Sequence, residues 1–120
     1  MKRSHAPIFW LLFGAGGMIA ALIGVPMVWI SGFDAAFGLL ISPAMLSFDN
    51  MRAFAQDPFG KLFLFITTSL FAWHAMHRIF HSLHDVGIPA GTAAKLICYG
   101  GALTITITAG TALLLLPGFN

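Results

Sequence analysis

Apolar residues form three long runs along this chain, and the shorter stretches between them hold most of the charged residues. The runs cover residues 8–30, 62–80 and 96–116. A helix needs roughly 20 residues to cross a hydrocarbon core of about 30 Å, so each run is long enough to do so. Backbone amides in lipid must find partners within their own segment, and three segments cannot close a barrel. The pattern therefore predicts an all-α membrane protein with three transmembrane helices.

Local features add detail to the first and third runs. The third contains LTITITAGT, whose alternating β-branched residues favour a strand in water, but lipid requires a helix here. Pro26 removes one backbone hydrogen bond late in the first run, which predicts a kink. Gly16, Ala20 and Gly24 recur at four-residue spacing and form a smooth strip, which predicts close packing against another helix.

The two connections between the runs differ in length. Residues 31–60 are too polar at their ends and too rich in Pro and Gly to span a membrane, and residues 43–55 are expected to form a short surface helix. The second connection, HDVGIPAGTAAK, is short and turn-like around Gly87, Pro89 and Gly91. The second and third helices are therefore predicted to be antiparallel neighbours.

Composition agrees with a membrane location. Hydrophobic residues make up 58% of the 120 residues and charged residues only 8%, which is far from the usage of soluble proteins. The length allows a single domain, taken as residues 1–120. The net charge of +2 is small and the basic residues are dispersed, so the chain is not expected to bind nucleic acid. Cys98 alone can form neither an internal disulfide nor a zinc site.

The basic residues also predict an orientation. Lys2 and Arg3 precede the first run, and Arg78 and Lys95 flank the second connection, whereas the first connection carries three aspartates. By the positive-inside rule, the N-terminus and the second connection are cytoplasmic. The C-terminus is then on the outer side of the membrane.

Polar side chains are concentrated at the cytoplasmic end of the second run, in WHAMHRIFHSLHD at residues 73–85. At about 100° per residue its histidines fall within about 80° of one another, and a cation and a carboxylate lie close to the same direction. The members of this polar stripe are His74, His77, Arg78, His81, His84 and Asp85. Ionisable groups at this depth are costly and usually face protein, water or a ligand.

Depth places part of the stripe beside the first helix. A rise of about 1.5 Å per residue puts His74 about 20 Å and His81 about 30 Å from the outer surface. The first helix begins on the same side of the membrane and contributes to the same layer. The predicted members of this layer are Trp10, Phe13, His77, Arg78 and His81. A pocket there would have aromatic walls and hydrogen-bonding or cationic tips.

Several functions fit such a layer. A haem iron would take one or two buried imidazoles, and His74 or His77 lies deep enough to serve. A zinc ion would need about four ligands, which one helix cannot supply, so no zinc site is expected. A quinone head group needs hydrogen-bond donors, a proton acceptor and an apolar entrance, and it uses every member of the layer. A third alternative is a structural stripe that reaches lipid head groups or docks a soluble partner.

Four segments carry a resemblance over nearly the whole chain: KRS at 2–4, APIFWLLFGAGG at 6–17, HRIFHSLHD at 77–85 and PAG at 89–91. With them the chain resembles the D subunit of bacterial fumarate reductase. The resemblance implies a non-catalytic, multi-pass anchor in the bacterial inner membrane, with its C-terminus in the periplasm. The implied partners are a flavoprotein subunit with FAD, an iron–sulfur subunit and a C anchor subunit.

The resemblance also implies a function and a site. Anchors of this type bind menaquinol near the cytoplasmic face, contain no haem and supply electrons for fumarate reduction in anaerobic respiration. The residues that match the family's quinone pocket are Trp10, Phe13, Gly14, His77, Arg78 and His81. His74 stands where the family often has cysteine and is left out of the site, and Phe80 stands where it often has histidine. The alternative is a haem b-binding anchor of a succinate dehydrogenase-type complex, with His74 or His77 on the iron.

Overall fold

The computed structural model describes residues 5–118, and all the regular structure in this part of the chain is helical. Three helical segments are long and apolar enough to cross a membrane: Trp10–Phe37, Pro58–Asp85 and Thr92–Leu115. The predicted class, an all-α protein with three transmembrane helices, is confirmed. In chain order the elements are α1 (Ala6–Ile19), the π-helical turn η1 (Ala20–Gly24), α2 (Val25–Val28), the π-helical turn η2 (Trp29–Asp34), α3 (Ala35–Phe37), the 3-10 turn η3 (Pro43–Leu46), α4 (Phe48–Gln56), α5 (Pro58–Asp85) and α6 (Thr92–Leu115).

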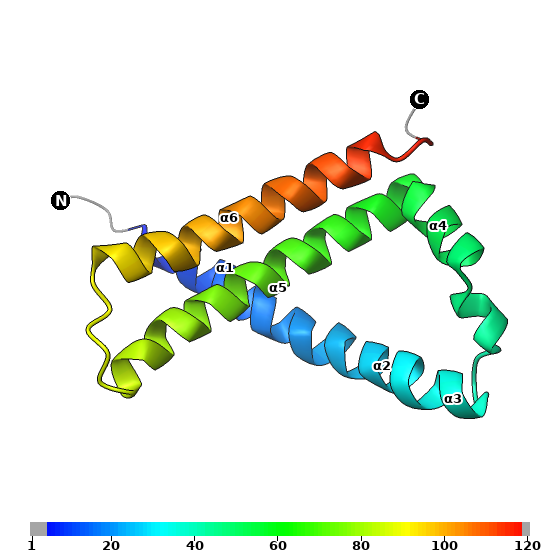
Figure 1. Ribbon diagram of the computed structural model, residues 1–120, viewed down its shortest axis with the longest axis horizontal. Helices are drawn as coiled ribbons and strands as arrows, with labels where there is room; N and C mark the ends of the chain where they lie inside the picture. The colour runs from blue at the N-terminus through cyan, green and yellow to red at the C-terminus, as the bar shows by residue number, and fades with distance from the viewer. Residues whose placement is uncertain (1–4, 119–120) are drawn as a thin grey trace.

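The segments from α1 to α3 form one long N-terminal helix (Figure 1). The prediction that the connection begins at residue 31 was wrong, because the helix continues to Phe37. The Ser31 hydroxyl donates to the carbonyl of Met27 at 2.6 Å, so its polar group is satisfied within the helix. The helix ends at Gly38, which has a φ of 61° and so adopts the left-handed conformation that glycine favours.

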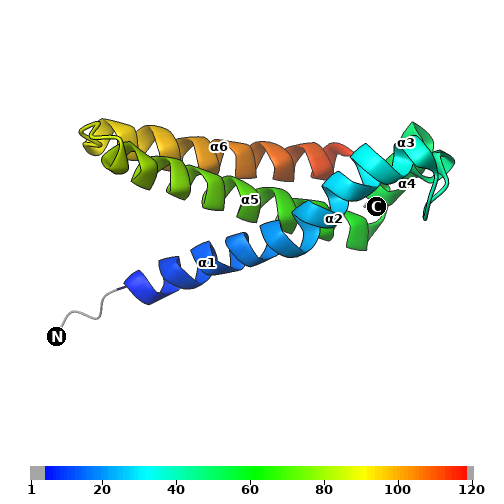
Figure 2. The same ribbon diagram turned by 90° about the horizontal axis from the view of Figure 1, so that it is seen from below.

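Pro26 lies directly after the first π-helical turn. This turn covers Ala20–Gly24, and α2 begins at Val25. Proline cannot donate a backbone hydrogen bond, and π-helical turns and proline are both frequent causes of helix bending. Figure 2 shows the N-terminal helix changing direction between α1 and α2, as the kink predicted from Pro26 requires.

A buried carboxylate fixes the chain where the N-terminal helix ends. Asp34 has an exposed fraction of 0%, and its two carboxylate oxygens accept hydrogen bonds from the backbone N–H groups of Leu40 at 2.6 Å and Ile41 at 2.8 Å. Its carbonyl oxygen accepts from the N–H of Gly38 at 2.6 Å. Asp34 therefore satisfies three donors that the helix end and the following turn leave open.

The short helix predicted at residues 43–55 is present with different limits. Pro43–Leu46 forms a separate 3-10 turn, and α4 begins only at Phe48, after the N-cap Ser47. Asp57 then caps α5, because its carboxylate accepts from the N–H groups of Phe59 at 2.9 Å and Gly60 at 3.1 Å. Ser47 and Asp57 therefore fix where α4 and α5 begin, which apolar periodicity alone does not specify.

The helices α5 and α6 are antiparallel neighbours, as the short second connection predicted (Figure 1). At one end the Lys61 ammonium donates to the carbonyl of Leu116 at 2.8 Å. Further along, the indole N–H of Trp73 donates to the Thr106 hydroxyl at 3.1 Å. The start of α1 lies at the end of the molecule that holds the α5–α6 connection, and the end of α6 lies at the other (Figure 1). Lys2 and Arg3, used to predict orientation, lie outside the described residues.

The run LTITITAGT is helical within α6, as predicted. The hydroxyls of Thr104, Thr106 and Thr111 each donate to the carbonyl four residues earlier, at 2.8 to 2.9 Å. Each hydroxyl is therefore satisfied inside its own helix, which lets β-branched polar residues lie in an apolar surrounding.

The close approach of α1 to α5 depends on glycine. A Cβ atom at Gly16 would meet the carbonyl oxygen of Leu70 at 2.7 Å and the Cβ of His74 at 2.9 Å, and one at Gly17 would meet the His74 ring at 2.8 Å. At Gly24 the same atom would only touch the Phe71 ring at 3.5 Å. The predicted small-residue strip therefore packs on α5, most tightly at its first member.

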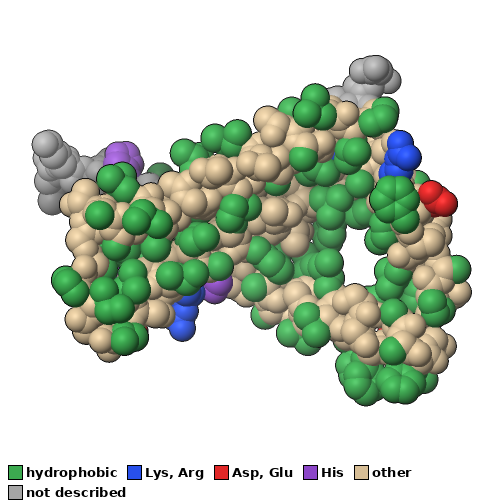
Figure 3. All heavy atoms as spheres, viewed as in Figure 1, with side chains coloured by type: hydrophobic (Ala, Val, Ile, Leu, Met, Phe, Trp, Pro, Cys, Tyr) green, Lys and Arg blue, Asp and Glu red, His purple; other side chains and the backbone are tan. Residues whose placement is uncertain are grey.

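Beyond this contact the two helices separate. The space-filling view shows an opening between the C-terminal half of the N-terminal helix and α5, with hydrophobic side chains around it (Figure 3). Toward its N-terminal end α1 also diverges from α5 and α6 (Figure 2). The residues predicted to form a functional site lie on α1 and α5, on the side of Gly16 that faces the α5–α6 connection.

We expect Gly16→Ala to weaken the structure. Its Cβ would lie below ordinary contact distance from the backbone of α5, and overpacking of this kind costs about 1–3 kcal/mol. Thermal denaturation of the purified membrane complex should show a lower midpoint than for the unaltered chain. Gly100→Ala is the matched control, because its Cβ meets nothing within 4 Å. Equal midpoints for the two variants would contradict the packing argument.

We expect Asp34→Ala to loosen the first connection. The change leaves two backbone N–H groups without their carboxylate, at about 1–3 kcal/mol each. Limited proteolysis of the complex should then cut residues 38–47 faster. Asp49→Ala, which removes an exposed carboxylate of α4, should leave the cleavage rate unchanged. Unchanged cleavage in Asp34→Ala would show that its buried bonds do not hold this segment.

Candidate functional site

His77 occupies the seam where all three transmembrane segments meet. It lies on α5 and is half-buried. Its ring centroid is 4.1 Å from that of Phe13 on α1, and its Nδ1 atom is 2.7 Å from the hydroxyl oxygen of Tyr99 on α6. A histidine within a membrane helix is costly without partners, and His77 finds them on both sides. The contact with Phe13 confirms that α1 and α5 bring these residues to the same layer.

Phe13 is held between two histidines of α5. Its ring stacks on that of His74 with a centroid distance of 4.8 Å and an interplanar angle of 14°. The Nδ1–H of His74 also donates to the carbonyl oxygen of Phe13 at 3.2 Å. The His77 ring contacts the same phenyl group. Phe13 therefore has a fixed position, which His74 determines through both its ring and its hydrogen bond.

Trp10 extends the aromatic surface by one turn of α1. Its ring meets that of Phe13 edge to face, with a centroid distance of 6.2 Å and an interplanar angle of 88°. The side chain is 70% exposed, and its indole N–H has no hydrogen-bond partner within residues 5–118. The indole thus offers a flat surface and a free donor at the edge of the cluster.

The polar stripe continues along α5 from His77. The rings of His77 and His81 are 4.3 Å apart, and those of His81 and His84 are 6.4 Å apart. Phe80 contacts the rings of both His81 and His84 from the side. The predicted common direction of these histidines is therefore confirmed. His81 and His84 are exposed on this chain.

Arg78 and Gly14 lie on the surface of the same region. The Arg78 side chain is exposed and forms no hydrogen bond or ion pair with another described residue. Gly14 is also exposed, and a Cβ atom there would meet nothing within 4 Å. Gly14 is therefore not required for packing within this chain, in contrast to Gly16. Figure 3 shows basic and histidine side chains together on the edge of this end of the molecule.

The structure brings four of the six predicted site residues into one continuous series of ring contacts: Trp10, Phe13, His77 and His81. Arg78 and Gly14 have no aromatic ring and take no part in this series, but each directly follows one of its members in the chain. Two residues that sequence reasoning left out, His74 and Tyr99, hold Phe13 and His77 in place. The sequence does contain a signal for Tyr99. Residues at equal distance from the turn between two antiparallel helices lie at the same level, and His77 and Tyr99 are equally far from Ile88 in the α5–α6 connection.

This arrangement offers hydrogen-bond donors beside an apolar wall. In this cluster, four side chains have polar groups without a hydrogen-bond partner among the described residues: the Trp10 indole N–H, His77 Nε2, the Arg78 guanidinium and both ring nitrogens of His81. Such donors beside aromatic rings suit a flat ligand with carbonyl or hydroxyl groups. A haem ligated by both His74 and His77 would have to displace the Phe13 ring from between them. Within residues 5–118, no three metal-binding side chains come together.

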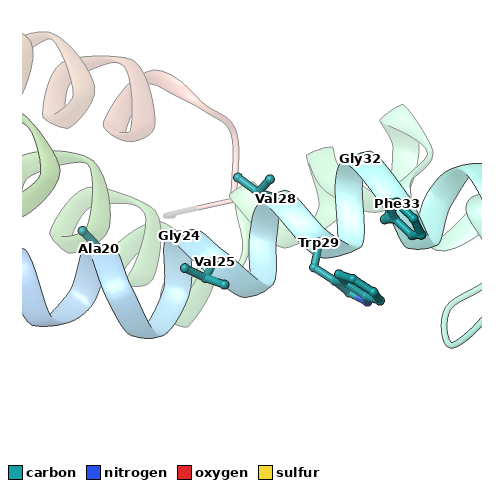
Figure 4. Close-up of a pocket in the computed structure, with 7 residues that line it drawn as sticks. All are labelled: Ala20, Gly24, Val25, Val28, Trp29, Gly32 and Phe33. Carbon is teal, nitrogen blue, oxygen red and sulfur yellow. The ribbon is translucent and has the colours of Figure 1, made fainter.

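Two hollows elsewhere in the described part of the chain are apolar. One follows the N-terminal helix, and its lining is Ala20, Gly24, Val25, Val28, Trp29, Gly32 and Phe33 (Figure 4). The other lies between the start of α5 and the end of α6, around Phe65 and Leu113. The first has no charged lining residue, and in the second Lys61 already donates to Leu116. The histidine cluster is therefore the better candidate for a polar ligand.

Comparison with known proteins identifies the family. A sequence model of the fumarate reductase D subunit matches residues 1–114. Over 108 residues the chain is 42% identical to the fumarate reductase D subunit of Vibrio cholerae serotype O1 (strain M66-2), covering 90% of this chain and 82% of the relative. Identity is 40% over 108 residues to that of Vibrio vulnificus (strain YJ016), covering 90% and 86%, and 40% over 111 residues to that of Shewanella sp. (strain W3-18-1), covering 90% and 88%. The chain belongs to the family of fumarate reductase D subunits.

Proposed function

We propose that this chain is a membrane-anchor subunit of a quinol:fumarate reductase and forms one wall of a menaquinol-binding site. The observation that carries the proposal is the series of ring contacts from Trp10 through Phe13 and His77 to His81. The series brings aromatic rings and unpaired donors side by side, which supports a site for a flat ligand with polar oxygens. Family membership supplies the reaction class, and the geometry supplies the candidate site.

Each residue of the wall has a physical role. Trp10 and Phe13 bound a flat ring, and the Trp10 indole can donate to a ring oxygen. Arg78 supplies a permanent positive charge, which stabilises negative charge on such an oxygen. His77 and His81 can accept or donate protons, because an imidazole ring carries both a donor and an acceptor nitrogen. A bound quinol supplies two electrons and two protons, so groups that accept protons are needed beside it.

The exposed half of the site points to partner subunits. Trp10, Gly14, Arg78 and His81 are all exposed on this chain, so a ligand bound here would still be open on one side. We propose that the C anchor subunit and the iron–sulfur subunit cover that side. Electrons then pass to the iron–sulfur subunit, and fumarate is reduced in the flavoprotein, which carries FAD. This chain is non-catalytic and contains no haem.

The proposed setting is the bacterial inner membrane in anaerobic respiration. The start of α1 and the α5–α6 connection lie at the same end of the molecule (Figure 1), and the positive-inside rule favours a cytoplasmic position for that end. The C-terminus is then periplasmic. The candidate site lies near the cytoplasmic end, close to where soluble partner subunits would dock.

We expect Arg78→Leu and Trp10→Ala each to lower quinol-driven fumarate reduction about tenfold or more, since each removes a contact to the ligand. Rates should be measured on the assembled complex in membranes. Fumarate reduction driven by a reduced viologen dye bypasses the quinol site, so this rate should be unchanged and serves to normalise for the amount of complex.

The two control variants change the same residue types far from the candidate site. Arg52→Leu removes an exposed cation of α4, and Trp29→Ala removes a half-exposed tryptophan from the other end of the N-terminal helix. Both should retain quinol-driven activity. Full quinol-driven activity in Arg78→Leu and Trp10→Ala would contradict the assigned site.

An optical spectrum with quinone extraction tests the cofactor assignment. The complex that copurifies with this chain from its native membrane should show flavin and iron–sulfur absorption, and solvent should extract a quinone from it. A reducible b-type Soret band that disappears in His74→Leu or His77→Leu would instead support the haem-anchor alternative. Absence of any quinone, together with that band, would overturn the proposal.

A further inference from the structure

Tyr99 is the centre of a second set of ring contacts, on the α6 side of His77. Its ring centroid lies 6.2 Å from that of Trp73, 6.1 Å from that of His77 and 5.7 Å from that of Phe80. The phenol ring therefore packs against one face of α5. The side chain is half-buried, and it is the only tyrosine in the sequence.

The Tyr99 hydroxyl is used differently from the threonine hydroxyls of α6. Thr104, Thr106 and Thr111 each donate to a carbonyl of their own helix, and Thr106 also accepts from Trp73. The Tyr99 oxygen has its hydrogen bond to the neighbouring helix, at 2.7 Å from His77 Nδ1. This is a short hydrogen bond by ordinary criteria. The single polar atom of Tyr99 is thus committed to a residue of the candidate site.

A phenol suits this position because it can either donate or accept. It donates to Nδ1 when the proton of the neutral imidazole is on Nε2, and it accepts when Nδ1 carries the proton. In both states His77 keeps its partner on α6, and Nε2 remains available on the other side of the ring. Phe13 limits the tilt of the same imidazole from α1, with a centroid distance of 4.1 Å.

We propose that Tyr99 is a positioning residue for the quinol site: its hydroxyl holds Nδ1 of His77 and so presents Nε2 to the ligand oxygen. This inference rests on the proposed function and adds a residue from α6 to a site otherwise built from α1 and α5. Tyr99 itself does not contact the ligand. Orientation of an imidazole by a hydrogen bond to its other nitrogen is a general way to fix which atom reacts.

The test compares Tyr99→Phe with Thr106→Val in the assembled complex. Both changes remove a side-chain hydrogen bond between α5 and α6, since Thr106 accepts from Trp73, but only Tyr99 bonds to His77. With Tyr99→Phe, kcat for quinol-driven fumarate reduction should fall about tenfold, and the viologen-driven rate should be unchanged. Calorimetric titration with a short-chain naphthoquinone should show Kd rising about three- to tenfold. Thr106→Val should change neither quantity.

A double-mutant cycle shows whether Tyr99 acts through His77. In a His77→Leu background, Tyr99→Phe should have no further effect on kcat or Kd. Tyr99→His keeps a ring with hydrogen-bonding nitrogens and should recover part of the loss. If Tyr99→Phe prevents assembly, Tyr99→Met, which also lacks the hydroxyl, is compared with Thr106→Val instead, and full quinol-driven activity in Tyr99→Met would overturn the inference.

Three other outcomes are distinct. Equal losses in Tyr99→Phe and Thr106→Val would assign Tyr99 to the helix interface alone and overturn the inference. Normal kinetics and binding in Tyr99→Phe, with a strong loss in Arg78→Leu, would overturn the inference and leave the proposed function standing. Normal kinetics in both would overturn the proposed function and the inference with it.

Discussion

The close approach of α1 to α5 at Gly16 and Gly17 determines the rest of this structure. Any side chain at Gly16 would collide with the backbone of α5, and one at Gly17 would collide with the His74 ring. Because both positions are glycine, His74 comes near enough to hydrogen-bond the carbonyl of Phe13 and to stack on its ring. The position of the Phe13 ring is therefore a consequence of the helix packing at Gly16 and Gly17, one turn further along α1.

Membrane burial explains how the polar groups of α5 are divided. Three polar rings that face another helix of this chain find partners there: Trp73 with Thr106, His74 with Phe13 and His77 with Tyr99. Groups on the remaining side, such as Arg78, are left exposed. In lipid this division would be unfavourable for an isolated chain. It becomes reasonable if partner subunits or a ligand cover the exposed side, which agrees with membership of a family of complex subunits.

Sequence reasoning recovered the three spans, their antiparallel pairing and the common face of the histidines, because lipid imposes length and hydrogen bonding directly. It placed the end of the first helix too early, since the buried bonds of Asp34 join residues that no periodicity connects. It left out His74 as an idiosyncratic residue and did not consider Tyr99. Both act through contacts between helices, and such contacts depend on rotation about each helix axis, which hydropathy does not specify.

The lengths of the helices have a consequence for how the protein lies in the bilayer. The helix α5 has 28 residues and α6 has 24, which correspond to about 42 Å and about 36 Å. Both exceed a hydrocarbon thickness of about 30 Å, so each helix is long enough to span it at a tilt. Since α1 is fixed to α5 at its glycine contact and diverges beyond it, the two helices cannot share one tilt angle. A change in bilayer thickness would then change the angle between α1 and α5, with the rotation centred at Gly16 and the ring of Phe13 close to that point.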